Sequence, residues 1–258
     1  MKRTELIMGM PVTVAIPERE SMDRSAHDGR FFSLAEGAEA VFAYFREIDE
    51  RFSPYNPESE TSRIDRGELR PEEASAEMQE VLRLSEETKQ ASDGFFDVWF
   101  QGRFDPSGLV KGWAIHNAAG ILDRSDFVSF CIEAGGDIEI RGANDEGAPW
   151  KIGIRSPFDP SNLIRVVSIQ NRGIATSGTY IRGSHIYNPR TGGRAGDIAS
   201  TTVIGPNVYE ADRWATAAFA MGRAGIDFVA SIPELDCYMV EWSGTATLTP
   251  GFQKYLSS

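Results

Sequence analysis

Two oxygen-bearing side chains stand four residues apart in the segment YEADRWATAAFAMG, residues 209–222. If this segment is a helix, Asp212 and Thr216 project from one face, with Cβ atoms about 5–6 Å apart. A carboxylate and a hydroxyl so placed suit a hard cation such as Mg²⁺, which takes oxygen ligands and keeps positions for water and substrate phosphates. An ordinary acidic residue that complements the dipole in a first helical turn gives the same pattern. Spacing alone leaves both interpretations open.

One histidine lies in a glycine-rich, polar context. The segment GSHIYNPRTGGRAGD, residues 183–197, contains His185. An imidazole with an ordinary pKa of about 6.5 can take a proton from an attacking hydroxyl. A histidine that only forms a hydrogen bond in a turn would look the same. His27, in a charged loop, and His116, in a predicted helix, are expected to be structural or solvated.

A turn that leads into a helix suggests a phosphate site. The segment FDPSGLVKGWA, residues 104–114, leaves backbone NH groups free at the helix start and places Lys111 in the first turn. The GxxxxGK[ST] and GxGxxG patterns are absent from the sequence. Their absence disfavours a Walker-type ATPase and a Rossmann dinucleotide-binding unit.

Two further glycine-containing segments are ambiguous. IEAGGDIEIRG, residues 132–142, indicates either a backbone bulge close to a ligand or a plain hairpin turn, followed by Asp137. GIATSGTYIRG, residues 173–183, carries Ser177 without a GxSxG context, so we do not interpret this serine as a hydrolase nucleophile.

Composition excludes several classes of protein. The chain has 258 residues, a formal net charge of −12 and a pI near 4.8, which disfavours nucleic acid as the main partner. An anionic ligand would need local cations such as Lys111 or Arg190. The first residues lack a secretory h-region and no window approaches ~20 apolar residues, so we expect a cytoplasmic protein without a membrane anchor. Cys131 and Cys237 are expected to be structural thiols in buried strands.

Apolar periodicity predicts the elements that position these residues. Residues 6–16 are predicted to form an opening strand. A long amphipathic helix is predicted over residues 33–51, with a capping-box pattern of Ser33 and Glu36 at its start. The segment 51–65 is predicted to be irregular. The other predicted helices cover 75–91, 109–122 and 209–221, and the predicted strands lie near 127–132, 135–141, 149–155, 165–170, 173–177, 199–204, 236–242 and 245–248. Together they predict an α+β fold, a single domain over residues 1–258 with a mixed or mainly antiparallel sheet and packed helices.

The order of the motifs is more specific than any one of them. In sequence they are MGM, FSPYNPESETSRID, DGFFD, DPSGLVKGWA, EAGGDI, IATSGTY, HIYNPRTGG and EADRWATAAFAMG. This series resembles the FAD:protein FMN transferase (ApbE) family from about residue 7 to residue 222. The resemblance implies an ApbE-like, T-fold-related fold with a flavin site in a cleft and Mg²⁺ beside the FAD diphosphate.

The resemblance also implies roles for individual positions. Asp212 and Thr216 match side-chain metal ligands of the family, the carbonyl of Gly108 matches its backbone ligand, and His185 matches a histidine that assists catalysis. Positions that match FAD contacts are Met8, Tyr55, Phe95, Phe96, Asp97, Asp105, Lys111 and Ile186. Tyr55 and Phe95 or Phe96 could pack on the isoalloxazine or adenine rings, and the alternative for at least one of the two phenylalanines is ordinary core packing.

The implied reaction transfers FMN from FAD to a Ser or Thr hydroxyl of an acceptor protein and releases AMP. Two departures from the family pattern concern the site: Asn188 stands where the family usually has Asp, and the segment 98–104 is short, which predicts a more open cleft. His116 stands where the family commonly has Asp, and we assign it no role. The alternatives are a Mg-dependent FAD pyrophosphatase that yields FMN and AMP, and a non-catalytic flavin-binding protein.

Overall fold

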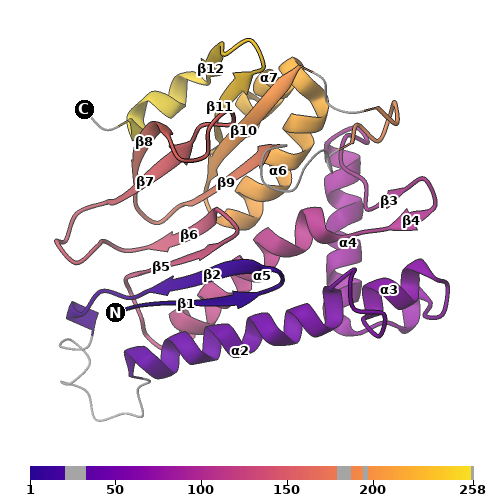
Figure 1. Ribbon diagram of the computed structural model, residues 1–258, viewed down its shortest axis with the longest axis horizontal. Helices are drawn as coiled ribbons and strands as arrows, with labels where there is room; N and C mark the ends of the chain where they lie inside the picture. The colour runs from indigo at the N-terminus through magenta and orange to yellow at the C-terminus, as the bar shows by residue number, and fades with distance from the viewer. Residues whose placement is uncertain (21–32, 179–186, 194–196, 257–258) are drawn as a thin grey trace.

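The central element of the protein is an eight-stranded sheet (Figure 1). The computed structural model describes residues 1–20, 33–178, 187–193 and 197–256. Within these residues, neighbouring strands of the sheet pair antiparallel in the order β1-β2-β5-β6-β9-β10-β11-β12. The strands are β1 Lys2–Ile7, β2 Met10–Ala15, β5 Phe130–Ala134, β6 Asp137–Arg141, β9 Gly173–Gly178, β10 Ile198–Gly205, β11 Asp236–Glu241 and β12 Ala246–Leu248. The predicted α+β class with an antiparallel sheet is confirmed.

Three long helices cover most of one face of this sheet. Helix α2 (Leu34–Phe52) packs on β1 and β2, α5 (Ser107–Arg124) on β5 and β6, and α6 (Val208–Met221) on β9 and β10. The short helix α7 (Gly225–Ala230) packs on β11 beside α6. Helix α5 also packs against both α2 and α6, so it lies between them (Figure 1). The larger hydrophobic core fills the space between these helices and the sheet.

The opposite face carries a smaller core and a second hairpin. Strands β7 (Trp150–Arg155) and β8 (Leu163–Ile169) pair antiparallel and contribute Ile154, Val167 and Ile169 to this core. The remaining elements are α3 Glu60–Asp65, α4 Ala76–Ala91, the short hairpin β3 Trp99–Phe100 with β4 Arg103–Phe104, and the 3₁₀ turns η1 Pro71–Glu73, η2 Gly222–Ala224 and η3 Pro250–Tyr255.

Strand β6 separates polar from apolar side chains by its alternation. Successive residues of a strand point to opposite faces. Ile138 and Ile140 belong to the smaller core, whereas Asp137 and Glu139 contact Lys111 and Val208 on the helix-covered face. Two buried carboxylates therefore stand beneath α5 and α6.

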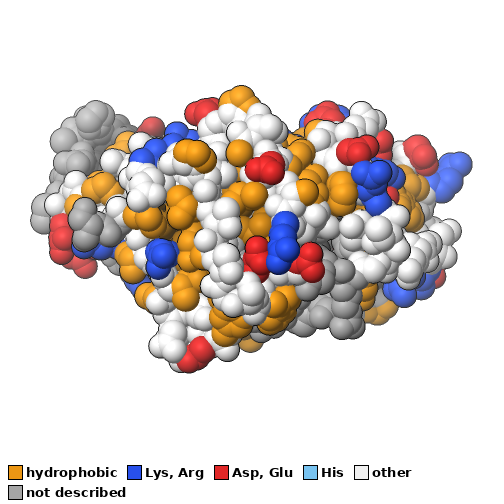
Figure 2. All heavy atoms as spheres, turned by 90° about the horizontal axis from the view of Figure 1, so that it is seen from above, with side chains coloured by type: hydrophobic (Ala, Val, Ile, Leu, Met, Phe, Trp, Pro, Cys, Tyr) orange, Lys and Arg blue, Asp and Glu red, His pale blue; other side chains and the backbone are white. Residues whose placement is uncertain are grey.

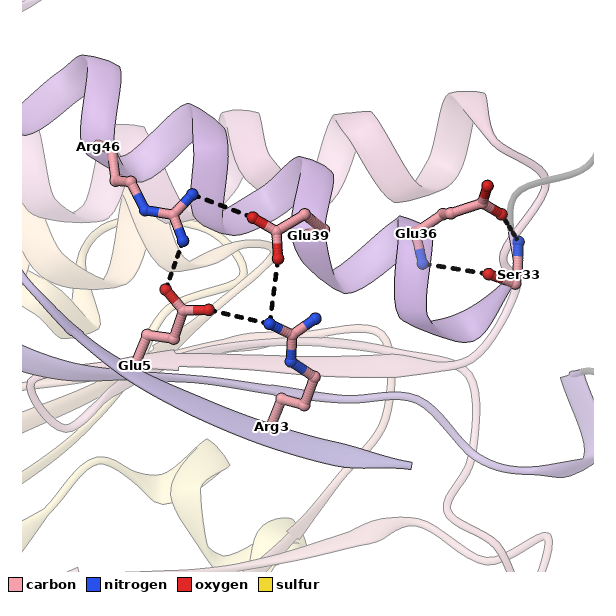
Figure 3. Close-up of polar contacts among 6 residues, drawn as sticks. All are labelled: Arg3, Glu5, Ser33, Glu36, Glu39 and Arg46. Carbon is pink, nitrogen blue, oxygen red and sulfur yellow. Dashed lines mark hydrogen bonds and ion pairs between the residues drawn. The ribbon is translucent and has the colours of Figure 1, made fainter.

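Helix α2 begins as its sequence predicts and is joined to the sheet by charged side chains (Figure 3). The hydroxyl of Ser33 accepts the Glu36 amide and the Glu36 carboxylate accepts the Ser33 amide, a complete capping box. Four further side chains form a closed network of ion pairs between β1 and α2, with N–O distances of 2.5–3.0 Å. They are Arg3, Glu5, Glu39 and Arg46.

Two local predictions are wrong. Residues 6–16 form a hairpin and not one strand, because Met8 and Gly9 both have positive φ, 56° and 67°, and reverse the chain between β1 and β2. The segment 51–65 is not wholly irregular, because α3 begins at a cap in which Ser59 accepts the Ser62 amide. Sequence reasoning also missed α7 and the β3–β4 hairpin.

The glycine pair of residues 132–142 forms a plain turn. Gly135 and Gly136 have φ of 58° and 96° and join β5 to β6, with Ala134 opposite Asp137. Only residues without a Cβ adopt such angles readily, which explains both glycines. The hairpin turn is therefore confirmed and the β5–β6 register shows no bulge, whereas a close approach of this turn to a ligand stays a prediction.

The surface is mixed in character. Figure 2 shows apolar side chains spread over one face of the molecule, with small groups of charged side chains between them. Scattered apolar side chains are normal on a protein surface and define no site by themselves. None of the helices in the described part of the chain has the length and apolarity that a bilayer crossing needs. Cys131 and Cys237 are free thiols in β5 and β11, and Cys237 is buried as predicted, whereas Cys131 is half-buried.

Candidate functional site

Asp212 is buried at the contact between α5 and α6. Its side chain is 4% exposed, and Oδ2 accepts a hydrogen bond of 2.9 Å from the amide of Gly112. A Cβ on Gly112 would lie 2.7 Å from the Cβ of Asp212 and 3.1 Å from the carbonyl oxygen of Val208. The glycine therefore permits this close approach of the two helices. The alternative that Asp212 is a surface residue complementing a helix dipole is wrong.

Lys111 lies between two buried carboxylates. Its ammonium forms an ion pair with Oδ2 of Asp137 and lies 3.7 Å from Oδ1 of Asp212. Asp137 is 1% exposed, and its Oδ1 accepts the amide of Thr176 at 3.0 Å. Sequence reasoning assigned no role to Asp137, which follows a glycine turn. The missed signal was the pair of acidic residues on one face of an otherwise apolar strand, Asp137 and Glu139.

The buried cluster carries uncompensated negative charge. Two carboxylates and one ammonium leave one net negative charge when all three groups are ionised. Burial raises the pKa of Asp212 to about 7, the ammonium of Lys111 opposes this rise, and the Asp137 carboxylate adds to it. A buried anion without a full counter-charge is unfavourable, so the site favours an added cation.

Thr216 and Gly108 lie beside each other at the same helix contact. The Thr216 hydroxyl lies 3.2 Å from Oγ of Ser177, and a Cβ on Gly108 would lie 3.7 Å from Cγ2 of Thr216. Gly108, Asp212 and Thr216 thus come from the facing parts of α5 and α6. The ligand atoms that these three residues offer to a metal are all oxygens, which Mg²⁺ prefers. Within the described ranges, no three His, Cys, Asp or Glu side chains gather to hold a metal, so a cation here would rely on hydroxyl, carbonyl and ligand oxygens as well.

The residues of DGFFD have separate environments. Phe95 lies under the guanidinium of Arg190, 5.1 Å from its ring centroid, and Arg190 also pairs with Asp93 at 2.7 Å. Phe96 is 4% exposed and packs in the larger core near Gly108, where one ring atom would lie 3.5 Å from an added Cβ.

Asp97 begins the short segment that leads to the β3–β4 hairpin. Its carboxylate pairs with Lys89 at 2.7 Å and accepts the amide of Trp99. Phe100 then stacks on Tyr187, with ring centroids 5.2 Å apart and an interplanar angle of 17°. The short segment therefore contacts residues 187–193, and a more open cleft on this side stays a prediction.

Asn188 has a local structural role. Its side-chain Oδ1 accepts the amide of Arg190 at 3.0 Å, and its carbonyl accepts the amide of Gly192 at 2.9 Å. An aspartate could accept the same amide in this turn. Asn188 thus holds this turn, and an Asp at the same position would preserve it.

Other predicted site residues lie apart from the contacts described above. Met8 is at the tip of the β1–β2 hairpin, where its amide donates to Asp49. Tyr55 is 93% exposed, so it is not a core aromatic, and it lines a cavity of about 230 Å³. Asp105 lies just before α5, where its carboxylate accepts the Ser107 amide. His185 and Ile186, together with His27, fall outside the described residues.

A larger cavity of about 450 Å³ lies along α5 and is lined by residues from Trp113 to Arg124, with Tyr44, Glu77, Glu80 and Arg141. It does not include Lys111, Asp212 or Thr216. We therefore place the candidate site at the buried α5–α6 contact, where the charged and hydroxyl groups converge.

The fold and this contact define an α+β protein with an acidic, oxygen-rich site between two helices that cover an antiparallel sheet. The chain belongs to the ApbE family, whose model matches residues 8–103 and 100–239. Gly108, Asp212 and Thr216 lie within those ranges.

Individual relatives agree with this assignment. The FAD:protein FMN transferase of Escherichia coli K12 is 32% identical over 167 residues, which cover 60% of this chain and 48% of the relative. The chain thus spans about half the length of such curated relatives. The FAD:protein FMN transferase of Chlamydia muridarum is 26% identical over 234 residues, covering 67% of this chain and 72% of that protein.

The fold matches solved structures along the whole chain. The crystal structure of the ApbE protein from Thermotoga maritima superposes with a TM-score of 0.83 at 21% identity, covering 100% of this chain and 99% of that one. The flavin transferase ApbE from Vibrio cholerae gives a TM-score of 0.83 at 20% identity, covering 99% of both chains. These similarities establish the fold.

Proposed function

We propose that this protein transfers the FMN part of FAD to a Ser or Thr hydroxyl of an acceptor protein in a Mg²⁺-dependent reaction that releases AMP. Membership of the ApbE family and relatives named FAD:protein FMN transferase support this activity. The observation that carries it is the buried Asp212 with its partly compensated charge, between Lys111 and Thr216. A diphosphate and a divalent cation would complement this site.

The residues present fit a magnesium ion. Asp212 and Thr216 would hold it with their side chains and Gly108 with its carbonyl, all of them oxygen donors. When bound, Mg²⁺ would neutralise charge on the diphosphate oxygens of FAD. Lys111 would add a second positive charge near the same oxygens. This local charge is needed because the chain as a whole carries a net charge of −12.

The remaining proposed contacts would orient FAD. They are Met8, Tyr55, Phe95, Phe96, Asp97, Asp105 and Ile186. The exposed ring of Tyr55 is available for stacking on a planar group, the half-buried ring of Phe95 already contacts the guanidinium of Arg190, and the buried Phe96 supports Gly108 from the core. These residues hold and orient the substrate, and the reacting bond is expected to lie over the N-terminal end of α5.

The proposed reaction is a phosphoryl transfer that balances without a redox partner. The hydroxyl oxygen of the acceptor forms a bond to the FMN-side phosphorus, and the bond from that phosphorus to the bridging oxygen breaks. AMP leaves with the bridging oxygen. His185 or a nearby carboxylate would take the hydroxyl proton, the role that an imidazole can fill near neutral pH.

The test is to incubate the protein with FAD, Mg²⁺ and a candidate acceptor, and to measure in-gel flavin fluorescence, free FMN and AMP. We expect fluorescent acceptor and AMP from wild type, with strong losses in Asp212→Ala and His185→Ala. Asp227→Ala, an exposed acid on α7, is the matched control and should keep full activity. Free FMN and AMP without labelled acceptor would indicate a pyrophosphatase, and bound FAD without turnover a flavin-binding protein. Labelling that persists in Asp212→Ala would contradict the metal role.

A further inference from the structure

We propose that Asp137 is a positioning residue that neutralises Lys111 and thereby leaves the charge of Asp212 available to a divalent cation. This inference rests on the metal role given to Asp212 in the proposed function. It adds a residue from the sheet to a site otherwise built from two helices.

The geometry gives Lys111 an unequal pair of partners. Its ammonium is in direct contact with Asp137 but 3.7 Å from Oδ1 of Asp212. Asp137 itself is fixed, since its other oxygen accepts the amide of Thr176 on the neighbouring strand β9. The sheet therefore holds the counter-ion of Lys111 in place, and the lysine is drawn toward the sheet and away from full contact with α6.

Asp212 is fixed by a backbone amide at one oxygen, and its other oxygen faces Lys111. One of its oxygens, Oδ2, accepts the Gly112 amide, and the other, Oδ1, is the one nearer to Lys111. If Asp137 lost its charge, the Lys111 ammonium would have only Asp212 as a carboxylate partner in this cluster. A lysine bound to Asp212 would compete with a divalent cation for the same oxygen and would repel it.

The neighbouring buried acid on β6 does not supply the same charge. Glu139 accepts the Val208 amide at 2.5 Å and forms an ion pair with Arg141. The negative charge of Glu139 is compensated by the N-terminus of α6 and by Arg141. Asp137 is therefore the carboxylate that the structure assigns to Lys111.

Counting charges in the cluster with all of its groups ionised, the state in which Asp212 can bind a divalent cation, gives a rank order for four proteins. Wild type carries one net negative charge, and Asp137→Asn carries none because the lysine remains. Lys111→Met carries two negative charges, and the double variant Asp137→Asn/Lys111→Met again carries one. Affinity for a divalent cation should therefore be highest in Lys111→Met, similar in wild type and the double variant, and lowest in Asp137→Asn.

Mn²⁺ is a suitable probe, because the free ion can be counted by electron paramagnetic resonance in the presence of saturating FAD and without an acceptor. Asp137→Asn should weaken Mn²⁺ binding about 10- to 100-fold, the usual effect of removing a partner behind a metal ligand. The double variant should return to within about twofold of wild type. Asn keeps an oxygen for the Thr176 amide, and thermal unfolding verifies that each variant is folded.

Two controls define the baseline. Asp212→Asn gives the Mn²⁺ held by FAD alone. Glu133→Gln removes the same charge from the neighbouring strand β5. Glu133 is paired with Ile138, so its side chain points to the face of the sheet opposite to that of Asp137. This variant should bind Mn²⁺ as wild type does.

Three results would overturn the inference. One is an Asp137→Asn protein that binds Mn²⁺ as tightly as wild type. Another is a double variant as weak as Asp137→Asn, because Asp137 would then act on the cation itself and not through Lys111. The third is wild-type binding no tighter than that of Asp212→Asn. The Mn²⁺ titration contains no acceptor protein, so its result does not depend on whether flavin transfer occurs. A failure of this inference is therefore distinguishable from a failure of the proposed function.

Discussion

The amide of Gly112 on α5 donates a hydrogen bond of 2.9 Å to Oδ2 of Asp212 on α6, so the backbone of one helix orients the central carboxylate of the other. This contact exists because Gly112 has no side chain. A Cβ there would lie 2.7 Å from the Cβ of Asp212 and 3.0 Å from Oδ2. Both atoms belong to a backbone-anchored, buried side chain that has little room to move.

Substitution Gly112→Ala should therefore damage both the fold and the site. We expect a loss of about 1–3 kcal/mol in the free energy of unfolding, the usual effect of overpacking. Divalent-cation binding should weaken as well, because Asp212 would be displaced. Urea unfolding and Mn²⁺ titration measure the two effects.

Gly120→Ala on the same helix is the matched control. A Cβ at this position would meet only the end of the flexible Arg124 side chain, 3.1 Å away. Replacing a helical glycine by alanine there should stabilise the protein by about 0.5–1 kcal/mol. Equal effects of the two substitutions would show that Asp212 is not held by a close helix contact.

Glu139 should be a large contributor to stability. It is fully buried, accepts the Val208 amide at the start of α6 and pairs with Arg141. Glu139→Ala leaves a buried amide and a partly buried guanidinium without this partner. Breaking a buried pair in this way costs about 3–5 kcal/mol. Chemical unfolding of the two proteins measures the difference.

Asp123→Ala tests whether the effect comes from burial. Asp123 contacts the same Arg141 at 3.5 Å, but its side chain is 43% exposed. Exposed pairs contribute about 0–1 kcal/mol, so this variant should unfold almost as wild type does. A loss in Asp123→Ala as large as in Glu139→Ala would contradict the buried-pair argument.

The sequence predicted best what depends on local periodicity. The helix of residues 33–51 was predicted with its capping box, because Ser33 and Glu36 act within one turn. The pairing of Asp212 with Thr216 on one helix face is also a local property. In contrast, the reversal at Met8 was missed, since a positive φ at a methionine is rare and leaves no compositional mark.

Asp137 shows why part of the site was beyond sequence reasoning. It lies 26 positions from Lys111 and 75 from Asp212 along the chain. Only the packing of α5 and α6 on β6 and β9 brings these groups together. A buried ionic cluster of this kind is a property of tertiary structure. From the sequence alone, only the two acidic residues on one face of a strand, Asp137 and Glu139, could be recognised.

The stack of Phe100 on Tyr187 should stabilise residues 187–193. Within this segment, the Asn188 amide donates to Gly193 at 2.8 Å and the Gly192 amide to Asn188 at 2.9 Å. Phe100→Ala removes the stack, and such ring pairs contribute about 0.5–1.5 kcal/mol. Hydrogen exchange of these amides should therefore become roughly two- to tenfold faster.

Trp99→Ala is the control for this prediction, because Trp99 lies in the same hairpin but packs on Phe104, 4.6 Å between centroids. It should leave exchange in residues 187–193 close to wild type. Asp93→Asn should also have little effect, since the Asp93–Arg190 pair is exposed. Equal acceleration by Phe100→Ala and Trp99→Ala would mean that hairpin integrity, not the stack, protects the segment.

The acid sensitivity of the fold should depend partly on α2. The Ser33 backbone lowers the pKa of Glu36, and the guanidinium of Arg46, with that of Arg3, lowers the pKa of Glu39, both from an ordinary value of 4.5. A lowered folded-state pKa gives stability that is complete above the unfolded value and is lost as the pH falls through the folded value. This contribution should therefore begin to fall below about pH 4.5 and be gone once the pH is below the lowered folded-state pKa values.

The double variant Glu36→Gln/Glu39→Gln tests this sign. Glutamine keeps the shape and can still accept the capping hydrogen bond, but it does not titrate. The variant should be less stable than wild type at neutral pH and should lose less stability on acidification, with the two proteins converging at low pH. Urea midpoints across the acid range measure this, and added salt should reduce the difference because both carboxylates are exposed. Glu47→Gln, on the same helix but outside the network, should run parallel to wild type, and a double variant that also ran parallel would show that these two carboxylates make no pH-dependent contribution.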